Sequence, residues 1–284
     1  MVQATLVAAI AAAVQFASPV VLSAEEGRRP ALMIEIDGAI GPATSRYVKE
    51  ALTTAGERRA EIVILRLNTP GGLVTSMREI IANVLGSPVP VIGYVAPSGA
   101  HAASAGTYIL YATHISAMAP GTNLGAATPV QIGGPLPGLP GSAPDKDGKD
   151  KKDDAQQPAL KDAMTAKSTN DAVALIRSLA ELHGHNADWA EKAVREAASL
   201  SASAALQSNV IDLVARNPTE LLQLIDGRTV EVAGGDKRQL ATKGLTIEQL
   251  DAGWMIRLLS VITDPNVAFI LLMVGIYGLP SHPA

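Results

Sequence analysis

The chain has 284 residues, no cysteine and a formal net charge of −4 at pH 7. Its length allows one large α/β domain with appendages. The absence of cysteine excludes disulfides, thiolate metal sites and a cysteine nucleophile, and the acidic balance gives no electrostatic basis for binding nucleic acid. His183 and His185 lack the spacing of metal ligands, so we expect a solvated helix end there and no metal site.

The N-terminal segment, residues 1–24, is expected to be a signal peptide. Residues 5–22 form an uncharged apolar run, and the small residues Ser23 and Ala24 follow it before two glutamates. No lysine or arginine precedes the run, and Leu22 is bulky for its place near a cleavage site. An uncleaved N-terminal anchor is therefore the alternative.

Residues 28–217 are expected to form the main domain, and its first half alternates between two patterns. Apolar, β-branched runs predict strands, and apolar residues at helical spacing predict the helices between them. The predicted strands are 31–36, 62–67, 89–95 and 115–119, and the predicted helices are 42–55, 73–85 and 105–112. Such alternation indicates an α/β fold in which helices flank a parallel sheet on both faces.

The segment 131–158 differs in composition from the rest of this domain. Five prolines, several glycines and a mixed-charge run at 145–154 predict a disordered loop. Beyond it, helices are predicted at 170–182 and 187–197, then a short helix from Ser201 and a strand at 210–214. Residues 218–252 are expected to form a helix and a small hairpin.

Residues 255–279 are expected to form a membrane segment. The run 267–279 is uninterrupted and apolar, and Trp254 and Tyr277 are placed to lie at the two interfaces. A spanning helix needs about twenty apolar residues, and a longer run would include Arg257, so a buried core helix is the alternative. The chain stops soon afterwards, and we expect further membrane segments to be missing.

Two glycine-rich segments, 68–72 and 98–107, each follow a predicted strand and lead into a predicted helix. Turns of this kind gather backbone N–H groups that bind anions, and Gly71 and Gly72 tolerate the positive φ that turns an N–H outward. Ser104 lies among alanines in the second segment, close to its own N–H and that of Ala105. It is a candidate nucleophile beside an oxyanion site, and a helix N-cap is its alternative role.

A serine hydroxyl needs a neighbouring base, and the sequence offers four candidates. His101 lies three residues before Ser104, which rarely lets an imidazole reach the hydroxyl, and His114 is expected to be structural. A lysine kept neutral by apolar burial is the other option. Lys167 lies just before the predicted apolar helix and Lys161 lies closer to the charged loop, and the residues alone do not choose between them.

Five motifs occur along the chain, and the first three are specific in this order. They are Asn68-Thr69-Pro70-Gly71-Gly72, Ala102-Ala103-Ser104-Ala105-Gly106-Thr107-Tyr108, Met118-Ala119-Pro120-Gly121-Thr122, Lys167-Ser168-Thr169-Asn170 and Thr263-Asp264-Pro265-Asn266-Val267-Ala268. Together they resemble the NfeD family, membrane-bound serine proteases of the Clp-protease class. The resemblance implies a Clp/crotonase-like fold and a Ser104–Lys167 dyad. It also implies an oxyanion hole from the Gly72 and Ala105 N–H groups, with Gly71 shaping the turn beside it.

The resemblance further implies a membrane-associated, ATP-independent endopeptidase that needs no cofactor. Its expected substrate and partner is an apolar segment of a stomatin-like membrane protein, and a homo-oligomer is expected. The signal-like N-terminus and the apolar C-terminus place the catalytic domain on the extracytoplasmic side. Two other functions stay open: a crotonase-type acyl-CoA enzyme, which the lack of an acidic pair in the turns disfavours, and a non-catalytic scaffold for membrane assembly.

Overall fold

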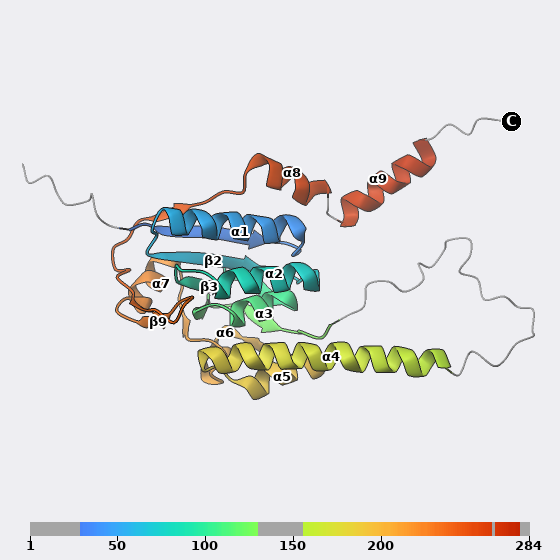
Figure 1. Ribbon diagram of the computed structural model, residues 1–284, viewed down its shortest axis with the longest axis horizontal. Helices are drawn as coiled ribbons and strands as arrows, with labels where there is room; N and C mark the ends of the chain where they lie inside the picture. The colour runs from blue at the N-terminus through green and yellow to red at the C-terminus, as the bar shows by residue number, and fades with distance from the viewer. Residues whose placement is uncertain (1–28, 130–155, 263–264, 279–284) are drawn as a thin grey trace, which may run out of the picture.

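The computed structural model describes residues 29–129, 156–262 and 265–278 (Figure 1). The predicted signal segment and most of the predicted loop 131–158 lie outside the described residues. The part of that loop that is described, residues 156–158, belongs to a helix.

A six-stranded sheet forms the centre of the domain, in the order β11-β1-β2-β3-β5-β8. Its strands are β1 (Ala31–Asp37), β2 (Ile62–Asn68), β3 (Val91–Val95), β5 (Ile115–Met118), β8 (Leu213–Val214) and β11 (Ile247–Gln249). Every pairing in it is parallel, so the predicted α/β fold with a parallel sheet is confirmed. The outermost strand β11 was not predicted, because three residues of mixed polarity carry no strand pattern.

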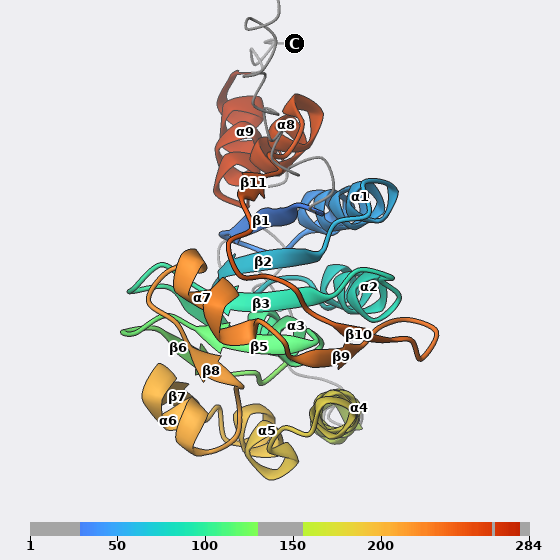
Figure 2. The same ribbon diagram turned by 90° about the vertical axis from the view of Figure 1, so that its left-hand side faces the viewer.

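The sheet is covered on both faces because its side chains alternate. On β2, Val63 and Leu65 belong to a core shared with α1 (Pro42–Glu57), α2 (Val74–Leu85) and α3 (Ala105–Tyr111). Ile62 and Ile64 belong to the opposite core, under α7 (Pro218–Ile225) and the hairpin of β9 (Thr229–Glu231) and β10 (Lys237–Gln239). Figure 2 shows α1 and α2 on one side of the stacked strands and α7 on the other.

A second, three-stranded sheet lies beside the carboxyl ends of the central strands. It consists of β4 (His101–Ala103), β6 (Asn123–Gly125) and β7 (Ser199–Ser201), in the order β4-β6-β7. Thr69, just after β2, bridges to Ala102 of β4. This sheet was not predicted, because its strands are too short to show a period, yet it connects the two glycine-rich segments.

The helix predicted from Asn170 is longer than expected. α4 runs from Gln156 to His183, and its first turns extend past α3 (Figure 1). Along its described side chains, Val173 is the first residue that is buried. α4 then packs against α3 and α5 (Ala187–Arg195). The predicted short helix follows as α6 (Ala202–Gln207), with Ser201 as its N-cap.

The predicted membrane segment 255–279 is not one helix but two. They are α8 (Trp254–Ile262), which packs against α1, and α9 (Pro265–Gly278). Pro265 takes the first position of α9, where a missing N–H costs little. None of the helices in the described part of the chain combines the length and the apolar character needed to cross a bilayer.

The expectation of a solvated helix end at His183 and His185 is wrong. His185 is buried, with its ring edge against Tyr111 and its Nε2 3.3 Å from both Asp212 Oδ2 and Ser116 Oγ. The short loop after α4 turns this histidine back into the domain, which sequence spacing does not reveal. Within the described ranges, no group of histidine and acidic side chains is arranged to hold a metal ion.

His114 is structural, as predicted. Its Nδ1 accepts a hydrogen bond from the Val91 N–H at 3.0 Å, which holds the start of β3. Burial, and to a lesser degree His183, lowers the pKa of His114 to about 4. The neutral ring is therefore the form that the folded protein favours.

We predict that His114 makes the protein less stable in mild acid. In the unfolded chain the pKa of a histidine is about 6.5. Between this value and the folded pKa of about 4, the unfolded state therefore binds more protons than the folded state. The free energy of unfolding should fall as pH drops through this window, by about 2 kcal/mol from pH 7 to pH 5 for His114 alone. Urea unfolding at both pH values should show a smaller fall for His114→Gln than for the wild type. An equal fall would contradict this role.

Candidate active site

Ser104 lies in the tight connection between β4 and α3, and its backbone is strained. Its φ is 51° and its ψ is −118°, a conformation that a residue with a side chain rarely adopts. Ser104 N–H donates to the Gly125 carbonyl at 3.0 Å. Ser104 Oγ makes no capping bond and no other hydrogen bond with the described residues. The hydroxyl is therefore available for chemistry, and the alternative role of Ser104 as a side-chain N-cap is not realised.

The turn after β2 is pressed against Ser104. Thr69 N–H donates to the His101 carbonyl at 2.7 Å, and Ala103 N–H donates to the Thr69 carbonyl at 3.0 Å. Gly71 has a φ of 113°, and a Cβ added to it would lie 2.6 Å from Ser104 Cβ. Only glycine fits at this position.

Two backbone N–H groups beside Ser104 are left without an acceptor among the described residues. Of the four donors named by the sequence, Gly71 N–H donates to Thr69 Oγ1 at 3.0 Å and Ser104 N–H to Gly125. No hydrogen bond from Gly72 N–H or Ala105 N–H is found in the described ranges. Gly72 also requires glycine, since a Cβ there would lie 2.0 Å from the Ile40 carbonyl oxygen. The geometry thus leaves Gly72 and Ala105, but not Gly71, as free donors.

A small pocket of about 100 Å³ opens beside Ser104. Its lining residues come from the two glycine-rich turns, from α2, α3 and the segment after β6, and from α4; they are Gly72, Val74, Met77, Arg78, Ser104, Ala105, Tyr108, Ala127, Pro129, Ser168, Asp171, Ala172 and Leu175. Tyr108 donates its hydroxyl to the Ala127 carbonyl at 3.0 Å, and burial raises the pKa of this tyrosine above its usual range. The pocket therefore has mainly apolar walls and a neutral phenol.

Lys167 lies on α4 at the edge of the face that lines this pocket. The residues directly after it on that face, Ser168 and Asp171, line the pocket together with Ser104, whereas Lys167 does not and its side chain is exposed. In the chain alone Lys167 is therefore not buried in apolar surroundings, because the first turns of α4 extend past the domain. Lys161 also belongs to α4, and its side chain lies outside the described residues.

Sequence reasoning missed one charged pair at the mouth of the pocket. Arg78 Nη2 of α2 lies 2.5 Å from Asp171 Oδ2 of α4. The two residues are 93 positions apart, and no motif links them. His101, the other candidate base, is part of β4, where its backbone N–H is bound to the Asn68 side chain at 3.3 Å.

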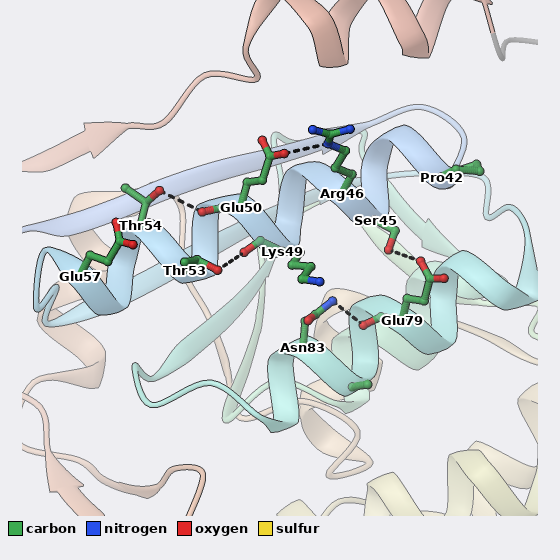
Figure 3. Close-up of a pocket in the computed structure, with 11 residues that line it drawn as sticks. Pro42, Ser45, Arg46, Lys49, Glu50, Thr53, Thr54, Glu57, Glu79 and Asn83 are labelled. Atoms are coloured by element: carbon green, nitrogen blue, oxygen red, sulfur yellow. Dashed lines mark hydrogen bonds and ion pairs between the residues drawn. The ribbon is translucent and has the colours of Figure 1, made fainter.

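A wider groove of about 930 Å³ lies between α1 and α2, away from Ser104 (Figure 3). Its side chains are largely polar, and the buried Ser45 donates its hydroxyl to Glu79 Oε2 at 2.6 Å. Arg46 and Glu50 form an ion pair along α1 at 2.7 Å. The serine of this groove is buried and bound to the Glu79 carboxylate, so it is not a free hydroxyl like that of Ser104.

Comparison with known proteins identifies relatives of the chain. A family model described as "NfeD1b, N-terminal domain" matches residues 31–233. The chain is 37% identical over 246 residues to "Membrane-bound protease PH1510" of Pyrococcus horikoshii, covering 86% of this chain and 51% of that protein. It is 36% identical over 107 residues to "Membrane protein NfeD1b" of Bacillus subtilis, covering 37% of this chain and 24% of that protein. The chain thus spans about half the length of the first relative and a quarter of the second.

Solved structures share the fold. One is described as the 1510-N membrane-bound stomatin-specific protease, a lysine-to-alanine mutant in complex with a substrate peptide; it matches with a TM-score of 0.69 and 34% identity, over 84% of this chain and 99% of that chain. A serine-to-alanine mutant of the same protease matches with a TM-score of 0.66 and 33% identity, over 80% and 100% of the two chains.

We predict that the strain at Ser104 can be measured. A positive φ at a residue with a Cβ costs about 1–3 kcal/mol. Glycine at position 104 removes this cost, but it also raises the conformational entropy of the unfolded chain, which cancels part of the gain in stability. Ser104→Gly should therefore exceed Ser104→Ala in free energy of unfolding by about 1 kcal/mol, as measured by urea denaturation. At Ser168, inside α4, the matched pair should show the opposite order, because glycine destabilises a helix. A less stable Ser104→Gly would show that this backbone is not strained.

Proposed function

The chain belongs to the NfeD family, and from that premise we propose that it is a membrane-associated serine endopeptidase that works without ATP or a cofactor. One observation carries the proposal. Ser104 holds an unengaged hydroxyl beside the unengaged N–H groups of Gly72 and Ala105. A nucleophile with free backbone donors beside it is the arrangement that acyl transfer requires.

In the proposed reaction Ser104 Oγ attacks the carbonyl carbon of a peptide bond, and Lys167 Nζ accepts the hydroxyl proton. The negative charge that develops on the carbonyl oxygen is stabilised by the Gly72 and Ala105 N–H groups. When the C–N bond breaks, Lys167 returns the proton to the leaving amine. Water then attacks the Ser104 ester and gives a proton to Lys167. The bond from the acyl carbon to Ser104 Oγ breaks, and Lys167 returns the proton to Oγ, which restores the free hydroxyl.

Lys167 must reach into the pocket for this reaction. It precedes Ser168, which lines the pocket with Ser104, and its long stem has several rotatable bonds. We infer that a bound substrate, or a second copy of the chain, covers the exposed side chain and makes the neutral amine more favourable. A homo-oligomer stays a prediction from the sequence.

The proposed substrate is an apolar segment of a stomatin-like membrane protein. Support comes from two sources: the relative described as specific for a stomatin homolog, and the walls of the pocket beside Ser104. Met77, Tyr108 and Leu175 line that pocket, and the exposed side chains of Leu73 and Val74 lie at the start of α2 next to Gly72. Apolar substrate side chains would be removed from water against these surfaces.

We propose that α9 holds the protein at a membrane, with the catalytic domain on the extracytoplasmic side. The described side chains of α9 include five large apolar residues that are more than half exposed: Phe269, Ile270, Leu271, Leu272 and Val274. Contiguous exposed apolar surface of this kind is typical of membrane or protein contacts. The curated relatives are themselves named as membrane proteins.

The Ser104–Lys167 dyad predicts a specific pattern of activity. Ser104→Ala should lower kcat/KM on apolar peptides by about a thousandfold or more. Lys167→Ala and Lys167→Arg should be about equally impaired, by roughly 100- to 10,000-fold, because arginine cannot accept the proton.

Lys161→Ala is the matched control for this pattern and should keep activity. Circular dichroism of each variant checks that the fold is retained. An active Lys167→Arg, or an inactive Lys161→Ala beside an active Lys167→Ala, would overturn the dyad. A turnover of acyl-CoA esters without peptidase activity would favour the crotonase-type alternative.

Membrane association through α9 predicts that charge on this helix releases the protein from lipid. With residues 1–24 removed, the protein should float with phosphatidylglycerol-containing liposomes. Leu271→Asp/Leu272→Asp should lower the lipid-bound fraction at least about tenfold, since each aspartate at bilayer depth costs about 2.5–3.5 kcal/mol. The control Leu182→Asp, on an exposed site of α4, should float like the wild type, and equal flotation of all three would refute the role of α9.

A further inference from the structure

The ion pair of Arg78 and Asp171 joins the two halves of the candidate active site. Arg78 belongs to α2, which follows the Gly71-Gly72 turn, and Asp171 belongs to α4, which carries Lys167. Their side chains meet at 2.5 Å and are 43% and 68% exposed, and both line the pocket beside Ser104. Exposed ion pairs contribute little to stability, so the pair calls for an explanation other than folding.

Asp171 lies four residues after Lys167, one turn along α4. Opposite charges at this spacing on a helix are neighbours and attract each other. Asp171 nevertheless pairs with Arg78, and in the described part of the chain no ion pair of Lys167 is found. Arg78 thus binds the Asp171 carboxylate, which helix spacing places within reach of Lys167.

A carboxylate beside an amine favours the charged ammonium form, whereas a nearby cation disfavours it. A lysine that acts as a base must be neutral and free to reach Ser104. We propose that Arg78 is a positioning residue for catalysis: it binds Asp171 and so prevents Asp171 from pairing with Lys167. This inference rests on the proposed role of Lys167 as the base.

Among the described side chains, few other charged or titratable groups lie around this turn of α4. Asp171 is the single carboxylate among the residues that line the pocket as described. Tyr108 faces the pocket from α3 as a neutral phenol. From α5, Arg195 binds Asn170 Oδ1 at 3.2 Å and Glu191 at 2.6 Å, so these charges already have partners. Arg78 and Asp171 are therefore the charges that govern Lys167 in this account.

The test measures how readily the Lys167 amine reacts with trace acetic anhydride, which acylates only neutral amines. Mass spectrometry of the Lys167 peptide gives the rate from pH 7 to pH 10 for the wild type, Arg78→Met, Asp171→Asn and the double variant. Arg46→Met, which breaks the equally exposed Arg46–Glu50 pair on α1, is the matched control. This readout does not require the protein to cleave anything.

We expect Arg78→Met to lower the Lys167 rate about two- to fivefold, the range that one exposed ion pair supplies. Asp171→Asn and the double variant should react at least as fast as the wild type, and Arg46→Met should be unchanged. In a peptidase assay kcat/KM should fall for Arg78→Met alone and return toward the wild-type value in the double variant.

Two results would overturn the inference. One is an unchanged Lys167 rate in Arg78→Met. The other is an equal loss of rate in Arg78→Met and the double variant, because a merely structural role of Arg78 would not be relieved by removing Asp171. If the Ser104–Lys167 dyad itself were wrong, Lys167→Arg would remain active. A wrong dyad can therefore be told apart from a wrong role of Arg78.

Discussion

The backbone hydrogen bonds between Thr69 and β4 are the constraint on which the site depends. They join the segment after β2 to the strand that ends just before Ser104, with N–O distances of 2.7 and 3.0 Å. The same threonine accepts the Gly71 N–H on its side-chain oxygen, and its Cγ2 fills the space that a side chain at Gly106 would need. Because both turns are held by one residue, the free N–H groups of Gly72 and Ala105 lie beside a single hydroxyl.

The site is divided between a rigid part and a helix that extends beyond it. Ser104 and its backbone donors are positioned by the two sheets, where close packing leaves room only for glycine at Gly71 and Gly72. The proposed base comes from α4, whose described side chains before Val173 are mostly exposed. Substrate binding and the Arg78–Asp171 pair therefore bear on the position and charge of Lys167 more than on Ser104.

Sequence reasoning succeeded where a pattern repeats over several residues. The apolar strands β1, β2, β3 and β5 and the helices α1, α2 and α3 were predicted close to their observed bounds. The small residues around Ser104 predict a nucleophile there, and that role stays a prediction. It failed where contacts join distant positions: the three-residue strands of the second sheet, the buried His185, and the Arg78–Asp171 pair have no local signal. The exposure of Lys167 in the single chain could not be predicted either, since periodicity does not reveal how far a helix extends past its domain.

The central claim is that Ser104 is a nucleophile activated by its surroundings, and fluorophosphonate labelling tests it most directly. A fluorophosphonate reacts with a serine hydroxyl that has a base and oxyanion donors beside it. Intact-mass and peptide mapping should find one adduct on the wild-type chain, located at Ser104, and slower labelling when Lys167 is replaced. An unlabelled wild-type protein, or an adduct on any other serine, would contradict the account.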